Sequence, residues 1–217
     1  MNFSVAIDGP AGAGKSTIAK LVASEFNLMY INTGAMYRAV ALKASENNID
    51  ENDIDSLCKL IDTFEMEFRN DDLFLNGENI QEKITMPEIS KIVSKYASIK
   101  EVRLKLVKLQ RDMSKRFNVI MDGRDIGTVV LKDSRFKFFL TATPEARAER
   151  RYKELKNRGL DVDFNTILED IIRRDHIDST REIDPLKKAD DAIEIDTTNL
   201  NIEEVVKKIS LSIKENL

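Results

Sequence analysis

The hydrophobic and polar positions at the start of the chain change from the period of a strand to the period of a helix. Phe3, Val5 and Ile7 recur at every second position, which predicts a strand. After a short glycine-rich stretch, Ile18 and Val22 recur with helical spacing. This order of a strand, a loop and a helix is typical of the repeating unit of α/β proteins.

The same alternation continues toward the C-terminus. Apolar runs predict further strands over 28–31, 118–127, 136–143 and 192–196. Helical spacing predicts helices over 32–44, 50–62, 87–117 and 144–158, then a second helix to about residue 180, and a last one from 202 onward. We therefore predict an α/β fold whose ligand site lies at the carboxyl ends of the strands.

The stretch 64–80 interrupts this alternation. Apolar residues occupy every second position within 64–68 and again within 73–75, and turn-forming residues stand at 70–72 and 76–77. This pattern predicts a small antiparallel meander of three strands, which belongs to an insertion in the α/β chain.

The charge balance excludes one large class of function. The 217 residues include 34 basic and 38 acidic side chains, for a net charge of −4, and 42% are hydrophobic. A chain of this charge is not expected to coat nucleic acid through non-specific attraction, so we predict no nucleic-acid partner. Any site for a polyanion must then be built locally.

The start of the chain and its cysteine content indicate a cytoplasmic protein. The first residues run directly into the predicted strand without a basic and apolar leader, and no apolar stretch is long enough to cross a membrane. We therefore expect no membrane partner. The single cysteine, Cys58, cannot form an internal disulfide, and its apolar neighbours predict a buried structural thiol.

The glycine-rich stretch carries the clearest chemical signal. Gly9, Gly14, Lys15 and Ser16 match the pattern G-x-x-x-x-G-K-[ST], between a predicted strand and a predicted helix. In this context the loop N–H groups and the helix N-terminus point at one volume, where the phosphates of a nucleoside triphosphate can bind. Lys15 is expected to reach the outer phosphates and Ser16 to ligate Mg²⁺.

This loop indicates nucleotide binding but leaves the reaction open, since many enzyme classes use it. The guanine-reading pattern N-K-x-D is absent from the sequence, which argues against a GTPase. The sequence also lacks the long coupling region that would indicate a motor protein. Phosphoryl transfer to a second substrate remains, and that substrate must be inferred from other residues.

Arginines are concentrated in the predicted helix pair that ends near residue 180. Arg147, Arg151 and Arg158 share one side of the first helix, and Arg174 and Arg181 share one side of the second with an aspartate. For Arg147 and Arg158 two interpretations stay open, a phosphate site or a solvated face paired with acidic neighbours.

Three further arginines border apolar segments near the expected ligand edge, namely Arg38, Arg103 and Arg124. Guanidinium groups match phosphate oxygens in pairs and stay charged. A monophosphate acceptor is already an anionic nucleophile, so its main barrier is the approach of two polyanions, which arginines and Mg²⁺ reduce. The arginine content therefore favours a phosphate acceptor over an alcohol.

In combination, these motifs resemble those of the bacterial cytidylate kinases, which are nucleoside monophosphate kinases with a P-loop. The resemblance covers essentially the whole chain and rests on "DGPAGAGKST" (8–17), "NTGAMYR" (32–38), "DGRDIGTVV" (122–130), "RRDHIDSTR" (173–181) and the meander. It implies transfer of the γ-phosphoryl group of ATP to CMP and dCMP, in pyrimidine nucleotide metabolism, by a Mg²⁺-dependent monomer.

The resemblance also implies the architecture. It is a single P-loop kinase domain, a three-layer α/β sandwich with a five-stranded parallel sheet, an inserted monophosphate-binding subdomain with a small antiparallel sheet, and a helical lid. The core would comprise 1–31, 118–145 and 182–217, the insertion about 32–117 and the lid about 146–181.

The family's site residues transfer to matching positions of this chain. ATP would be bound by Gly9, Pro10, Ala11, Gly12, Ala13, Gly14, Lys15, Ser16 and Thr17, with Ser16 as the metal ligand. CMP would be bound by Thr33, Tyr37, Arg38, Ser94, Arg103, Arg124, Asp125, Asp178 and Arg181. The catalytic residues would be Lys15, Arg150, Arg151 and Arg174.

The resemblance also implies which part of CMP each group of these residues contacts. The acceptor phosphate is assigned to Arg38, Arg103 and Arg181, the cytosine edge to Ser94, Arg124 and Asp125, and the sugar hydroxyl to Asp178. The chain departs from the family's usual "DSGA-YR" stretch, because Asn32 and Thr33 replace the first two residues.

Several alternatives stay open at this point. Tyr37 is either a core aromatic or a site residue, and Asp122 either supports Mg²⁺ or caps a turn. His176 is expected at the surface. The acceptor could be another nucleotide or a shikimate-like metabolite. The chain could also be an ATP-binding regulatory module without an acceptor.

Overall fold

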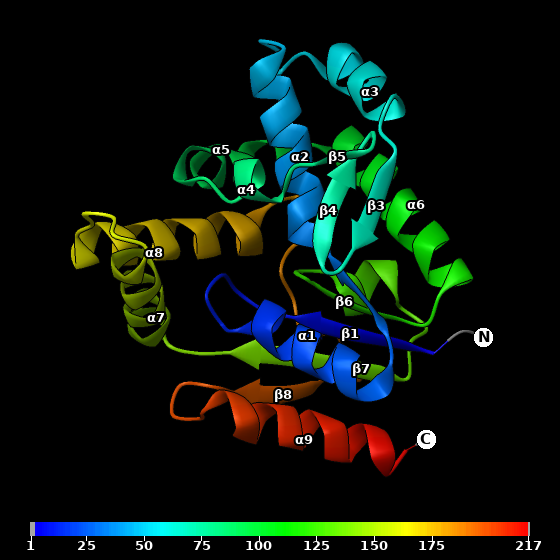
Figure 1. The fold of residues 1–217 in the computed structure, drawn as a ribbon, viewed down its shortest axis with the longest axis vertical. Helices are drawn as coiled ribbons and strands as arrows, with labels where there is room; N and C mark the ends of the chain where they lie inside the picture. Colours follow the sequence, from blue (N-terminus) through cyan, green and yellow to red (C-terminus); the bar gives the residue numbers. More distant parts are fainter. Residues whose placement is uncertain (1–2, 217) are drawn as a thin grey trace.

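The computed structural model describes residues 3–216, and its centre is a parallel sheet of five strands in the order β2-β6-β1-β7-β8 (Figure 1). The strands are β1 (Ser4–Asp8), β2 (Met29–Asn32), β6 (Val119–Gly123), β7 (Phe136–Thr141) and β8 (Ile193–Asp196). The predicted strands are confirmed, although the run at 118–127 ends as a strand at Gly123 and continues as a π-helical turn over Ile126–Val130.

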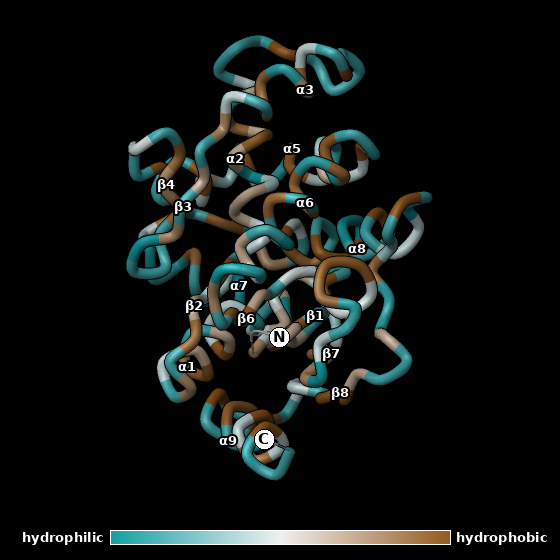
Figure 2. Tube along the Cα trace, turned by 90° about the vertical axis from the view of Figure 1, so that its right-hand side faces the viewer, coloured by the Kyte–Doolittle hydropathy of each residue, from teal (hydrophilic) through white to brown (hydrophobic). Residues whose placement is uncertain are grey.

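Helices cover both faces of this sheet, which confirms the three-layer prediction. Since side chains alternate along a strand, Val5 and Ile7 point to one face and Ala6 to the other. On the first face lie α1 (Lys15–Phe26) and α9 (Ile202–Lys214), and on the second lie α2 (Thr33–Glu46) and α6 (Lys100–Arg116). Figure 2 shows the hydrophobic stretches of the strands near the middle of the molecule.

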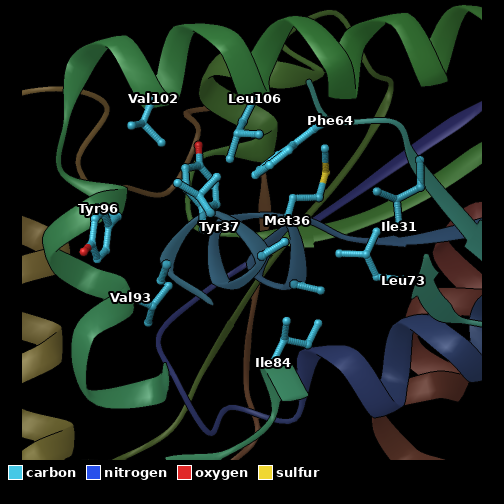
Figure 3. Close-up of a cluster of buried hydrophobic side chains, with 14 of the residues drawn as sticks. Ile31, Met36, Tyr37, Phe64, Leu73, Ile84, Val93, Tyr96, Val102 and Leu106 are labelled. Carbon is cyan, nitrogen blue, oxygen red and sulfur yellow. The ribbon is translucent and has the colours of Figure 1, made fainter. Parts of the chain in front are cut away.

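The insertion stands beyond one edge of the sheet and packs around α2. It contains α3 (Ile54–Asp62), the antiparallel strands β3 (Met66–Arg69), β4 (Asp72–Leu75) and β5 (Glu78–Asn79), the short α4 (Gln81–Ile84) and α5 (Pro87–Ala97). The meander is confirmed, whereas α4 was not predicted. Figure 3 shows side chains of α2, α5 and α6 pointing toward one another, among them Met36, Val93 and Leu106.

The predicted helix pair is α7 (Pro144–Asn157) and α8 (Phe164–Thr180), which lie side by side away from the sheet (Figure 1). Thr143 caps α7 by accepting from Ala146 N at 3.2 Å, and Pro144 occupies the first turn, where a missing N–H costs nothing. Ala148, Leu155, Ile167 and Ile171 form a small apolar cluster of their own between the two helices.

The prediction that Cys58 is a buried structural thiol is not met. Cys58 is only partly buried, since its neighbour Leu57 takes the inward position of α3. Within residues 3–216 no helix combines the length and the apolar character that a membrane span requires.

Candidate active site

The glycine-rich loop is held tightly between β1 and β7. Gly9 has a φ of +146°, and a Cβ at this position would stand 2.0 Å from the carbonyl oxygen of Leu140, so no other residue fits. Gly14 has a φ of +87° and forms the N-cap of α1. The loop therefore leads from the sheet into a helix whose N-terminus is free to bind an anion.

Lys15 is buried at the start of α1, where its Nζ donates to the carbonyl oxygen of Pro10 at 2.7 Å. Burial, and then the nearby Arg124, lower the pKa of Lys15 well below its usual value, while Asp122 and Asp8 oppose this shift. A lysine in such surroundings gains stability when a polyanion binds beside it.

Ser16 and Asp122 form an oxygen-rich pair below this lysine. The Ser16 hydroxyl donates to one carboxylate oxygen of Asp122 at 2.8 Å, and the Tyr30 hydroxyl donates to the other at 2.9 Å. Asp122 thus contacts the predicted metal ligand instead of only capping a turn. Hydroxyl and carboxylate oxygens are the hard donors that suit Mg²⁺.

A single cleft of about 1180 Å³ runs from this loop to the insertion and the helix pair. The predicted site residues that line it are Ala11, Gly12, Ala13, Gly14, Lys15, Ser16, Thr17, Thr33, Tyr37, Arg38, Ser94, Arg103, Arg124, Asp125, Arg150, Arg151, Arg174, Asp178 and Arg181. Gly9 and Pro10 are not among the lining residues, because they form the base of the loop next to β7.

One end of the cleft has an excess of positive charge. The Nε atoms of Arg38 and Arg174 are buried and donate to no hydrogen-bond partner within residues 3–216. Burial, followed by the neighbouring Arg124 and Arg38, lowers the pKa of Arg174 to about 10, and burial with Arg124 and Arg151 lowers the pKa of Arg38. Buried donors beside like charges are the environment that an anionic group would satisfy.

The other end of the cleft is a closed network of opposite charges. Arg103 Nη2 donates to Asp125 Oδ2, and Arg181 Nη2 donates to Asp125 Oδ1 at 3.3 Å. Burial alone would lower the pKa of Arg103, but Tyr37, Asp125 and Asp184 outweigh burial and raise it. The Arg103 guanidinium also lies 5.4 Å from the centre of the Tyr37 ring, so this tyrosine is both a core and a cleft residue.

Between the two ends, Arg124 Nε donates to Asp178 Oδ2 at 2.7 Å. Burial would raise the pKa of Asp178, but Arg124, Arg174 and Arg181 together outweigh burial and lower it, so the carboxylate stays ionised. Arg124 lies near enough to Arg38 and Arg174 to lower their pKa values, so it belongs with them at the positive end. Arg103 and Arg181 belong with Asp125. The expected roles, which placed Arg103 and Arg181 on the phosphate and Arg124 on the base, stay a prediction.

Asn32 and Thr33, where the chain departs from the family pattern, keep clear structural roles. The Asn32 side chain accepts from Ala35 N at 2.9 Å and caps α2. The Thr33 hydroxyl donates to the carbonyl oxygen of Asp122 at 2.7 Å. The neutral amide therefore performs the capping that an acid would perform.

Arg147 proves to be neither a solvated residue nor a cleft residue. Its guanidinium is buried and donates to the carbonyl oxygens of Ala142 at 2.9 Å and Ala11 at 3.0 Å, and to both carboxylate oxygens of Asp175 at 3.1 and 2.5 Å. Arg158, by contrast, lines the cleft. Arg147 ties the loop, β7 and α8 together.

Arg150 and Arg151 of α7 also differ in their contacts. Arg151 lies close enough to Arg38 to affect its pKa, and its Nη1 also donates to Glu154 at 2.6 Å. Arg150 donates to the hydroxyl of Thr197 at 3.1 Å and to the carbonyl oxygen of the same residue. His176 is exposed, as predicted.

Three parts of the site were not found from the sequence. The turn after β8 lines the cleft through Thr197 and the first residues of α9, and its place after a strand could have indicated this. Asp8 accepts from the backbone N–H groups of Ile126 at 2.8 Å and Gly127 at 2.7 Å, holding the turn that follows Asp125. Asp184 contacts Arg103 and Arg181, and no sequence signal pointed to it.

Comparisons with known proteins show the family to which the chain is related. The family model described as "Cytidylate kinase" matches residues 5–215. A cytidylate kinase of Clostridium perfringens (strain SM101 / Type A) is 67% identical over 208 residues, covering 96% of each chain. One of Clostridium acetobutylicum is 63% identical over 206 residues, covering 95% of each. The crystal structure of an uncharacterized protein from Eubacterium ventriosum shares the fold alone, with a TM-score of 0.53, 13% identity and 99% of both chains covered.

Proposed function

The chain belongs to the cytidylate kinase family, and from this membership we propose that it transfers the γ-phosphoryl group of ATP to CMP and dCMP, giving ADP and CDP or dCDP. The observation that carries the proposal is the pair of buried Nε atoms on Arg38 and Arg174, without partners within residues 3–216, in the same cleft as Lys15. Such donors suit a second phosphate group next to the first.

In this reaction an oxygen of the acceptor phosphate forms a bond to the γ-phosphorus of ATP. The bond from that phosphorus to the β,γ-bridging oxygen breaks, and the electron pair leaves with ADP. The backbone of the glycine-rich loop and Lys15 hold the phosphates of ATP, and Arg38, Arg124, Arg151 and Arg174 offset the charge of the two polyanions. No carboxylate base is needed, because the acceptor oxygen is already ionised.

The oxygen donors of Ser16 and Asp122, 2.8 Å apart, suit a magnesium ion bound together with the phosphates of ATP. When bound, Mg²⁺ would neutralise charge on the β- and γ-phosphates. Ser16 would ligate it directly, and Asp122 would hold the Ser16 hydroxyl in place.

The charge distribution of the cleft supports a revised division of the acceptor contacts. We assign the phosphate to Arg38, Arg124 and Arg174, where positive charge is in excess. We assign the base to the neutral end, where Ser94, Arg103 and Asp125 line the cleft. A guanidinium can donate to a base carbonyl and a ring nitrogen, and a carboxylate can accept from an exocyclic amine, which is the pattern of cytosine.

The apolar cluster between α7 and α8 supports a lid over about 146–181 that closes on ATP and excludes water. Thr197, which Arg150 contacts, would then lie beside ATP. We further propose that the chain acts as a monomer in the cytoplasm. Size-exclusion chromatography with light scattering would test the first of these statements, and fractionation of cells the second.

The test of the function is ADP formation from Mg·ATP with each nucleoside monophosphate and deoxy-monophosphate supplied singly. We expect turnover with CMP and dCMP, and a loss of about a hundredfold or more in Arg124→Ala, since a charge-stabilising contact is removed. Lys153→Ala, an exposed change on α7, is the matched control. Preference for another monophosphate would overturn the assignment of cytosine. Absence of acceptor-dependent ADP would favour an ATP-binding regulatory module.

A further inference from the structure

Asp184 adopts a backbone conformation that few side chains tolerate. It lies on the segment that returns from α8 to β8, and its φ is +48°, in the left-handed region. Glycine adopts this region freely, and asparagine and aspartate adopt it more often than other side chains do. Asp184 does not line the cleft, so its left-handed backbone matters through the contacts that it allows.

Asp184 contacts the two arginines that pair with Asp125. The Asp184 carboxylate accepts from Arg103 Nε at 3.0 Å, and its carbonyl oxygen accepts from Arg181 Nε at 2.7 Å and also from Arg181 Nη2. Arg103 and Arg181 each donate to a different oxygen of Asp125. The left-handed backbone lets one residue present its carboxylate to one arginine and its carbonyl oxygen to the other.

Every nitrogen of the Arg103 guanidinium donates a hydrogen bond in the resulting network. Its Nε is taken by Asp184, its Nη1 donates to the carbonyl oxygen of Ala97 at 3.1 Å, and its Nη2 donates to Asp125. The side chains of Arg103, Asp125 and Arg181 are 1%, 7% and 5% exposed, so water does not compete strongly for these bonds. Asp125 is consequently fixed in one orientation.

The network also sets the charge at this end of the cleft. Two arginines face two aspartates, so the group is neutral, whereas the guanidinium groups of Arg38 and Arg174 at the other end have unpartnered Nε atoms within residues 3–216. Without Asp184 the base end would carry a net positive charge and would attract an anionic group. Asp184 therefore favours a neutral base there and leaves the phosphate to the other end.

We propose that Asp184 is a specificity-determining residue, which positions Asp125 through Arg103 and Arg181 so that the site selects a pyrimidine with an exocyclic amine over one with a carbonyl. The inference rests on the proposed function, in which Asp125 faces the base. An oriented carboxylate accepts from the amine of cytosine and repels the carbonyl of uracil, but a carboxylate free to turn discriminates less.

Two variants separate the effect of the Asp184 carboxylate from the effect of the Asp184 backbone. Asp184→Asn keeps the shape and tolerates the left-handed region but removes the charge, and Asp184→Gly keeps the backbone and its carbonyl oxygen but removes the side chain. Glu182→Gln is the matched control, because Glu182 is exposed on the same segment and outside the cleft lining. For each protein we would measure kcat and KM with CMP and with UMP, and equilibrium binding of both nucleotides.

We expect the preference for CMP over UMP in kcat/KM to fall about tenfold in Asp184→Gly and less in Asp184→Asn. The change should come from a higher KM for CMP, while kcat stays within about twofold of the wild-type value. Glu182→Gln should match the wild type. An unchanged preference and KM in a folded Asp184→Gly, or a uniform loss of kcat with both nucleotides, would overturn the proposal. If Asp184→Gly does not fold, the same criteria apply to Asp184→Asn.

If the proposed function itself is wrong, the same measurements give a different result. If the wild-type chain forms no ADP with either nucleotide, the assignment as a kinase of CMP falls. The binding measurements then decide on Asp184 by themselves, since tighter binding of CMP than of UMP that is lost in Asp184→Gly supports the inference, and equal ratios in both proteins refute it.

Discussion

Replacing the buried Arg147 by alanine should destabilise the fold and weaken ATP binding together. The guanidinium satisfies the carbonyl oxygens of Ala11 in the glycine-rich loop and Ala142 after β7, and it pairs with Asp175 of α8. Its side chain is 3% exposed and that of Asp175 is 25% exposed. The substitution leaves two carbonyl groups and one carboxylate without their donor.

The magnitude follows from the exposure of these groups. Breaking a buried ion pair by removing one partner costs about 3–5 kcal/mol. Water can reach the quarter-exposed Asp175, so we expect the lower end, about 3 kcal/mol in the free energy of unfolding. For a chain of this size that corresponds to a decrease in Tm of about 6–12 °C. Because Ala11 loses its anchor, the KM for ATP should rise more than the KM for CMP.

Urea titration with the free energy extrapolated to water, together with steady-state kinetics, measures both effects. Lys153→Ala on the same helix is the control, since Lys153 and Glu149 are 3.1 Å apart with side chains 69% and 50% exposed, and such a pair contributes about 0.2–1 kcal/mol. A loss below about 1 kcal/mol in Arg147→Ala, comparable with the control, would refute the reasoning that burial makes this pair structural.

Three further predictions concern the cleft. Burial raises the pKa of Asp8 to about 7, above its usual 3.8, so the stability that this group contributes is lost as the pH rises through 7. Between pH 5 and 8 the free energy of unfolding in urea should therefore fall for the wild type and fall less for Asp8→Asn. Arg174→Gln should raise the unfolding free energy by about 1 kcal/mol, because it removes a buried charge among like charges, while kcat falls about 10²–10³-fold. Ser16→Ala should raise the Mg²⁺ concentration for half-maximal activity in a metal titration, with Tm changed little.

Each of these predictions can fail in a defined way. Equal pH dependence of stability in the wild type and in Asp8→Asn would show that Asp8 does not titrate in this range. A lower Tm in Arg174→Gln would mean that this arginine stabilises the free protein. An unchanged metal titration in Ser16→Ala would remove its hydroxyl from the proposed magnesium site.

Local patterns in the sequence were sufficient for the elements and the loop. The strands and helices follow from the spacing of apolar residues, as with Val5 and Ile7 in β1 and Ile18 and Val22 in α1. The meander followed from two turn signals between alternating residues. The glycine-rich loop was identified from its own residues, because a tight loop before a helix N-terminus is specified by a few adjacent positions.

The pairing of charged residues could not be predicted in this way. The spacing left Arg147 as either a phosphate contact or part of a solvated helix face, yet α8 and the loop bury it against Asp175, which is 28 positions away. Asp8 holds N–H groups 118 and 119 positions later, and Arg103 contacts a residue 81 positions later. Spacing along one helix says which side a residue takes, but it does not say what faces that side.

The sequence by itself determined the α/β fold, the phosphate-binding loop and the arginine-rich character of the site, since each depends on neighbours within a few turns of chain. Only the tertiary structure decided how the arginines divide. It joined Arg103 and Arg181 with Asp125 and Asp184, and it left Arg38 and Arg174 with buried Nε atoms that have no partner within residues 3–216. Electrostatic energy at a site depends on distance and burial in space, and these are fixed only when segments far apart in the chain come together.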